Sequence, residues 1–211
     1  MEKTFRLATS PKRSREIMGK NFFGLEEIFS HFVARITKKK KQFAALSEVP
    51  FSEAVLEELK DTHILIAVLP FSILEIRSKV ASSLFLSHEG AWYNKKSFAK
   101  KHGQTKWQLV RKTEVANSTS KSWREQQVLL SKDEEVPTAQ VMVYTIIGHY
   151  LATGEHLFKN TNVRTSSVVS NGGHVGVCYI DSIDSIPPRI GININTFSDR
   201  THLGIASARK F

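Results

Sequence analysis

Apolar residues along the chain follow patterns that predict both helices and strands. Residues 63–70 form a nearly unbroken apolar run, partly β-branched, which is typical of a strand buried on both faces. Residues 107–111 predict another strand, and apolar positions recur at helical spacing over residues 23–37. The strongest helix signal spans residues 136–153 and is followed by Gly154, which favours a left-handed helix end. We expect this last segment to be the central core helix.

The last quarter of the chain has the alternating pattern of β-strands. Residues 163–169 and 174–180 flank a glycine-rich turn and predict a hairpin. Residues 189–196 and 203–208 predict two more strands, the first with isoleucine at every second position. The four segments together predict an antiparallel β-meander at the C-terminus.

These elements favour the α+β class. We expect an N-terminal helical segment, a few β–α elements, the core helix and the C-terminal antiparallel β-meander. The alternative is a small α/β protein with a mixed sheet, because the strands expected at 63–70, 82–87 and 107–111 alternate with helices.

The stretch Asn-Ser-Thr-Ser-Lys at residues 117–121 permits two interpretations. Ser122 and Glu125 have the spacing of a capping box, so the stretch would be the polar loop before a helix. Ser118 and Lys121 also fit the S-x-x-K pattern of penicillin-binding proteins, in which the serine is acylated. We favour the helix entrance, because the Ser-Asp-Asn and Lys-Thr-Gly motifs that accompany that pattern are absent. Replacement of Ser118 is then expected to be nearly silent.

Charge is distributed unevenly along the 211 residues. The formal net charge is +10, from 30 lysine and arginine residues against 20 acidic ones. Residues 1–50 hold 11 of the basic residues and 5 of the acidic ones, a net charge of +6. We therefore divide the chain into a basic helical N-terminal segment, residues 1–48, and an α+β core domain, residues 49–211. Such a bias favours polyanionic partners, although a solvated basic face is a competing interpretation.

Several classes of protein are disfavoured by composition. Cys178 is the single cysteine, so an internal disulfide and a multi-cysteine metal site are excluded. No apolar run approaches the ~20 residues that span a bilayer, and the start of the chain lacks the apolar core of a secretory signal. We expect a cytoplasmic protein with no membrane partner, in which Cys178 is a buried, inert thiol.

Other polar residues give only weak signals for chemistry. His149 and His156 are seven residues apart, but no third metal ligand accompanies them. Asp181 and Asp184 flank a loop after the strand that starts at His174, and we favour turn residues over half of an acid–base pair. No catalytic residue, metal ligand or cofactor is therefore assigned.

One combination of residues does suggest binding. Aromatic and lysine residues interleave between positions 92 and 107, as in proteins that stack bases on aromatic rings while lysines neutralise phosphates. The competing interpretation is a set of core aromatics with a solvated basic back. Together with the earlier lysine run, this pattern predicts nucleic-acid contacts from Lys38, Lys39, Lys40, Lys41, Trp92, Lys95, Lys96, Lys100, Lys101 and Trp107.

Three functions remain open at the level of sequence. The leading hypothesis is a non-enzymatic nucleic-acid-binding protein that acts through its basic surface. The second is an interaction or regulatory module whose basic face meets an acidic protein. The third is a small hydrolase or nuclease built on the region of His174, Asp181 and Asp184. Oligomeric state leaves no signal in the sequence.

Five segments of the chain resemble bacterial proteins of no assigned activity. They cover residues 49–77, 92–100, 117–130, 136–158 and 203–210. The resemblance spans roughly residues 49 to 210 and implies a bacterial protein inside the cell. Since no characterised family is involved, the resemblance implies no functional residues.

Overall fold

The first of two sheets is built from strands that lie far apart in the sequence. The computed structural model describes residues 8–31, 40–86, 90–185, 188–197 and 202–211. The strands of this sheet lie in the order β1-β2-β3-β9-β4. Strand β1 runs parallel to β2, and the other neighbours are antiparallel. Its members are β1 (Phe22–Phe23), β2 (His63–Val68), β3 (Lys106–Arg111), β4 (Glu134–Glu135) and β9 (Ala208–Arg209).

The second sheet contains the predicted C-terminal strands in the order β7-β6-β5-β8. Strands β6 and β7 form an antiparallel hairpin with unbroken register from His174–Phe197 to Ser182–Arg189, and β5 pairs antiparallel with β6. Strand β8, in contrast, pairs parallel with β5. The members are β5 (Val163–Val168), β6 (His174–Ser182), β7 (Arg189–Phe197) and β8 (Gly204–Ile205).

The predicted fourth strand of the meander is divided between the two sheets. The Ala206 N–H donates to the carbonyl of Arg164 on β5, whereas the Ser207 carbonyl accepts from the N–H of Arg111 on β3, both at 3.0 Å. The chain therefore leaves the second sheet and enters the first between these two residues. Every residue from Leu203 to Ala208 is buried, so neither face of this segment is exposed to solvent and alternation could not mark the change.

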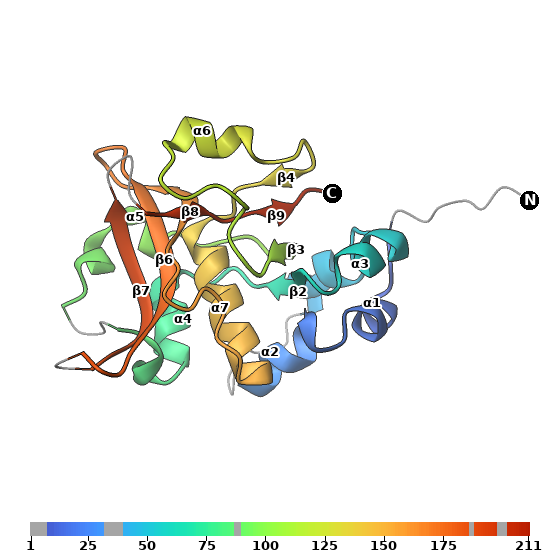
Figure 1. Cartoon of the computed structure of the whole chain (residues 1–211). Coiled ribbons are helices and arrows are strands. Elements are labelled where there is room, and N and C mark those ends of the chain that lie inside the picture. Colours follow the sequence, from blue (N-terminus) through green and yellow to red (C-terminus); the bar gives the residue numbers. More distant parts are fainter. Residues whose placement is uncertain (1–7, 32–39, 87–89, 186–187, 198–201) are drawn as a thin grey trace, which may run out of the picture.

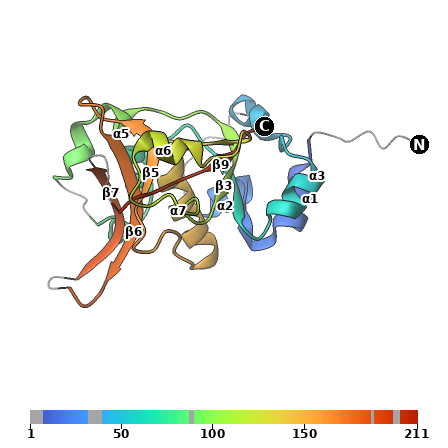
Figure 2. The ribbon, with the colours of Figure 1, turned by 45° about the horizontal axis from the view of Figure 1, so that its top comes forward.

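Helix α7 (Ala139–Thr153) is the central helix that the apolar pattern predicts. Thr138 caps it by accepting the N–H of Val141, and Gly154 ends it in the left-handed conformation, with φ of 76°. The helix lies between the two sheets in both views of the ribbon (Figures 1 and 2) and contacts β2, β5 and β6. Its residues 139–149 are all buried, so it is enclosed on every side.

The glycine inside α7 is explained by a close neighbour. A Cβ atom at Gly148 would lie 3.0 Å from Cε1 of Phe23, whose strand β1 passes beside the helix. Glycine costs roughly 1 kcal/mol relative to alanine in a helix. The approach of β1 accounts for that cost.

The remaining helices are short, and most begin at the capping residues that the sequence shows. Capping boxes are formed by Ser72 with Glu75 and by Ser122 with Glu125, and Ser10 and Ser52 also cap helices. The α-helices are α1 (Pro11–Met18), α2 (Leu25–His31), α3 (Glu53–Leu59), α4 (Ile73–Lys79), α5 (Ser97–Lys100) and α6 (Trp123–Val128). The 3-10 turns are η1 (Gly19–Asn21), η2 (Lys40–Leu46), η3 (Ser82–Leu84) and η4 (Trp92–Lys95).

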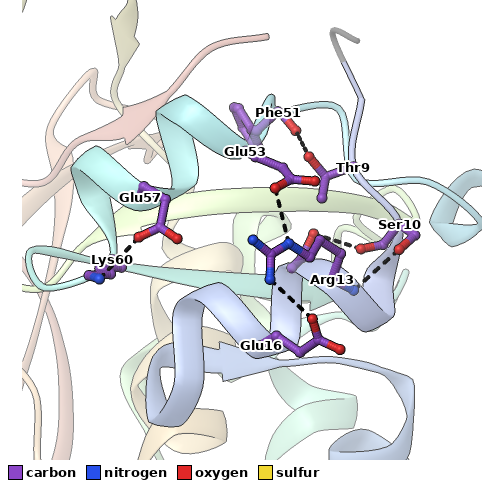
Figure 3. A network of polar contacts seen from close by, with 9 residues as sticks. Thr9, Ser10, Arg13, Glu16, Phe51, Glu53, Glu57 and Lys60 are labelled. Carbon is purple, nitrogen blue, oxygen red and sulfur yellow. Dashed lines mark hydrogen bonds and ion pairs between the residues drawn. The ribbon is translucent and has the colours of Figure 1, made fainter.

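The N-terminal segment shares its core with the rest of the protein. Thr9 and Val49 form a β-bridge, and the Thr9 hydroxyl donates to the Phe51 carbonyl at 2.6 Å (Figure 3). Arg13 of α1 reaches across to Glu53 of α3 at 3.0 Å, as the same view shows. Core residues from α1, β1 and α2 belong to the same buried cluster as those of α7. The boundary predicted at residue 48 is therefore crossed by both backbone and side-chain contacts.

The α+β class is confirmed, and the α/β alternative does not hold. Strands β2 and β3 are antiparallel neighbours, from His63–Arg111 to Val68–Lys106. Over residues 82–86, the described part of the strand expected at 82–87, the chain forms the turn η3 and an isolated bridge between Phe85 and Ile192. Within the described residues, no helix combines the length and apolar character needed to cross a membrane.

Candidate nucleic-acid interface

The loop before α6 is a helix entrance, and its Ser118 is buried. Ser122 accepts the N–H of Glu125, whose carboxylate accepts the Ser122 N–H at 2.8 Å. Ser118 is fully buried, and its Oγ accepts the N–H of Ile205 on β8 at 3.1 Å. Because its hydroxyl is buried, Ser118 is not accessible to an acylating substrate. The preferred interpretation of the stretch is thus confirmed, but Ser118 has a structural role that the sequence did not show.

The polar residues considered for hydrolysis do not converge. His174 begins β6 and Asp181 lies near its other end, so about 23 Å of extended strand separates them at ~3.3 Å per residue. Asp181 instead forms an ion pair with Lys159 at 2.6 Å. Asp184 lies in the turn after β6. His174 and Asp181 are therefore too far apart to act together as an acid–base pair. In the part of the chain that the structure describes, no three His, Cys, Asp or Glu side chains are grouped to hold a metal ion.

Burial and ring stacking account for the positions of three further residues, His149, His156 and Cys178. His149 is buried and lies 3.4 Å from the Glu155 carboxylate, and burial lowers its pKa despite that contact. The His156 ring stacks between Tyr150 and Tyr179, with centroid distances of 4.2 and 3.7 Å. Cys178 is fully buried, and loss of solvation raises its pKa to about 11. Little thiolate forms near neutral pH, which agrees with an inert thiol.

Three of the eleven basic residues in the N-terminal segment form ion pairs with glutamates of the protein. Arg13 pairs with Glu16 and Glu53 (Figure 3). Arg15 pairs with two further glutamates, Glu26 and Glu27, through both of its terminal nitrogens. Lys20 reaches Glu155, at the far end of α7, at 2.6 Å. Glu16, Glu26 and Glu27 are already subtracted in the net charge of +6 for residues 1–50, so only the pairs with Glu53 and Glu155 lower the positive field below that value.

The predicted contacts of the lysine run at residues 38–41 lie outside the described side chains, whereas the environment of Trp107 is defined. Lys38 and Lys39 lie outside the described residues, and only the backbone of Lys40 and Lys41, in η2, is described. Trp107 is 2% exposed, and its Nε1 donates to a backbone carbonyl at 3.3 Å. A base has no open ring face to stack on there, so the prediction for Trp107 is wrong. The reason is the alternation of β3, which points Trp107 into the core beside Phe22.

The predicted lysines between Lys95 and Lys101 form an exposed basic surface. Lys95, Lys100 and Lys101 are exposed and Lys96 is partly exposed, and none of them has an ion pair with a described residue. Their segment lies on the side of the molecule away from α1 and α3 in both ribbon views (Figures 1 and 2). Four positive charges within seven residues are thus presented together, well separated from the N-terminal segment.

Trp92 provides an aromatic ring beside these lysines. Its side chain is 38% exposed, and its Nε1 donates to the Ile194 carbonyl on β7 at 2.8 Å. The ring also packs against the edge of Tyr93 and against Phe98, with centroid distances of 6.1 and 5.8 Å. These contacts hold the indole in one orientation while part of its surface stays open to solvent.

A cavity of about 730 Å³ opens next to the same lysines. Its walls come from α5, β3, the connection between β4 and α7, the first turn of α7, and β5. Phe98 and Lys101 of the predicted basic segment line one side of it, and Gln108 and Gln140 line the interior. The volume falls within the ~300–1,000 Å³ range of ligand sites. Basic segment and cavity therefore form one continuous region.

Sequence reasoning missed both glutamines. Gln108 is 1% exposed although it lies in a strand, and Gln140 is 6% exposed in the first turn of α7. Each is a long polar residue within an otherwise apolar run, which was the available signal. The pattern alone gave no indication that the two side chains border one cavity.

Comparisons with protein-family models, curated proteins and solved structures returned no match for this chain.

Proposed function

We propose that the protein is a non-enzymatic single-strand nucleic-acid-binding protein whose contact surface is the segment from Trp92 to Lys101. The observation that carries the proposal is the group of four solvent-accessible lysines without described ion pairs, next to a tryptophan fixed in place by its own hydrogen bond. Lysines neutralise phosphates and release counterions, and an indole face accepts any base. The two contributions together favour binding with little dependence on sequence.

Single strands are favoured over duplexes by the aromatic contribution. A base can stack on Trp92 only when it is unpaired or lies at an end, because bases in a duplex already stack on one another. A duplex would engage the lysines alone. We therefore expect tighter binding of a single-stranded oligonucleotide than of a duplex with a comparable number of phosphates.

The test is a fluorescence-anisotropy titration of a labelled single-stranded oligonucleotide at several salt concentrations. A variant with Lys95, Lys96, Lys100 and Lys101 all replaced by glutamine should bind more weakly. Its slope of log affinity against log salt should be shallower by about 3 if each lysine contacts one phosphate, at ~0.7 per phosphate for single strands. Trp92→Ala should weaken binding by ~1–3 kcal/mol with nearly the same slope.

The control removes the same amount of charge elsewhere. It carries four lysine-to-glutamine replacements outside the proposed surface, at Lys12, Lys121, Lys132 and Lys210. Equal losses in the two quadruple variants would mean that net charge alone attracts nucleic acid. A third variant with glutamine at Lys38, Lys39, Lys40 and Lys41 measures the other basic run predicted from the sequence. Binding no tighter than ~0.1 mM at physiological salt would refute the proposal.

A further inference from the structure

The cavity beside α5 contains a buried amide group that the fold does not satisfy. Gln108 is 1% exposed and lines the cavity, and its Nε2 has no hydrogen-bond partner among the residues that the structure describes. Leaving a buried donor unpaired is costly, and native proteins rarely do so without a reason. An acceptor supplied by a bound ligand would satisfy this group.

A second amide in the cavity is fixed in a complementary manner. The Nε2 of Gln140 donates to the carbonyls of Leu69 and Phe71 at 3.3 and 2.9 Å, which leaves its Oε1 as the remaining polar atom of that amide. Gly103 lies against this group, since a Cβ there would be 2.6 Å from Oε1. Glycine thus keeps the space beside the oxygen open. The lining thereby includes one amide with an unpaired donor and one amide whose oxygen accepts no hydrogen bond from the described residues.

The other walls fit a flat, largely apolar ring that carries a negative group on one side. Phe98, Val141 and Val168 supply apolar surface, and Val168 is 47% exposed at the opening. Lys101 and Lys106 bring positive charge to the lining. Lys106 is only loosely held by Glu135, at 4.0 Å. Since Glu135 also lines the cavity and repels anions, a phosphate is favoured on the Lys101 side.

From this geometry we propose that the cavity binds one nucleobase, with the amides of Gln108 and Gln140 at the base edge and the phosphate of the same nucleotide at Lys101. Base edges present donors and acceptors side by side, and a glutamine amide pairs with them well. A nucleotide within a strand and a free mononucleotide share this chemistry. The strand is favoured, because Lys101 belongs to both the cavity lining and the exposed lysine surface; in this form the inference rests on the proposed function.

The experiment compares four 5′-mononucleotides and four short single-stranded homopolymers with an oligonucleotide of the same length that has abasic sites. In the homopolymer arm we expect one base to be preferred over the abasic strand by roughly tenfold. Gln108→Leu should abolish that preference without changing the salt dependence of binding. It should also leave the melting temperature equal or higher, because the variant no longer buries an unpaired amide. Gln127→Leu, an exposed glutamine of α6, is the matched control.

The outcomes separate this inference from the proposed function. Tight binding of every homopolymer and of the abasic strand with equal affinity would overturn the base site and leave strand binding intact. If no strand binds but a mononucleotide does, and Gln108→Leu removes that binding, the cavity is a free-nucleotide site and the proposed function fails. Absence of binding by strands and mononucleotides alike would overturn both.

Discussion

Two serines four residues apart should respond differently to the same substitution. Ser118 is fully buried, and its hydroxyl is the acceptor for the backbone N–H of Ile205. Ser122 is partly exposed and caps the six-residue helix α6. The Ser118→Ala change leaves a buried N–H without an acceptor. The Ser122→Ala change removes a helix cap, but the N–H groups at the start of α6 can then bond to water. The sequence pattern ranks Ser122 as the important residue, and the structure reverses that ranking.

The magnitudes follow from what each substitution leaves behind. A buried N–H without an acceptor costs ~1–3 kcal/mol. Loss of a helix cap costs ~0.5–2 kcal/mol, and we place Ser122 in the lower half because water replaces the hydroxyl in an exposed, short helix. Thr119 lies between the two serines and is exposed, so Thr119→Ala should change the free energy of unfolding very little.

Urea denaturation of the three variants and the unmodified protein measures these differences. The slope of unfolding free energy against urea should stay constant, because none of the substitutions alters the surface exposed on unfolding. Ser118→Ala should lose about 2 kcal/mol, against about 0.5–1.2 kcal/mol for Ser122→Ala. If Ser118→Ala were the milder of the two, the argument from the buried N–H of Ile205 would be refuted.

Two further predictions concern the core. His63 is 2% exposed, and burial, aided by the charge of Arg111, lowers its pKa from 6.5 to about 4. Unfolding therefore takes up a proton between these values, so this contribution to stability is complete above pH 6.5 and about 3 kcal/mol is lost as the pH falls through 4. In urea unfolding from pH 7 to pH 4, His63→Gln should show a correspondingly weaker pH dependence, and identical profiles would contradict the assignment. Ile147→Ala, at a position 1% exposed in α7, should cost ~2–5 kcal/mol, and an unchanged melting temperature would contradict its core position.

Local features of the fold were readable from the sequence because they depend on residues a few positions apart. The cap at Ser72 and the box at Ser122 need only the residue three places later, and α7 needs only its own periodicity and Gly154. The same holds for the hairpin of β5 and β6, where two extended segments and the glycine-rich turn between them define the partners. Such signals lie within one helix or one hairpin.

Features that depend on distant partners were not readable. The role of Ser118 is set by Ile205, which lies 87 residues later in the chain. The last strand changes sheets because its backbone bonds first to Arg164 on β5 and then to Arg111 on β3. No local pattern in the sequence connects either of these strands to residue 207. Trp107 and Gln108 are neighbours on β3 and face opposite sides, so deciding which side holds the cavity required the position of α7.

The positive charge of the candidate interface also depends on distant partners, which the sequence alone does not show. A count of charges along the sequence gives the N-terminal segment the largest excess, but ion pairs with Glu53 and Glu155, which lie outside this segment, offset part of it. The segment around α5 has a smaller excess of positive charge in the sequence. No described carboxylate, however, lies within ion-pair distance of Lys95, Lys96, Lys100 or Lys101. Attraction of a polyanion depends on charges that are not already neutralised, because only these exchange counterions with phosphates. Among the described residues, the lysines next to Trp92 are therefore the basic group whose charge stays available to a polyanion.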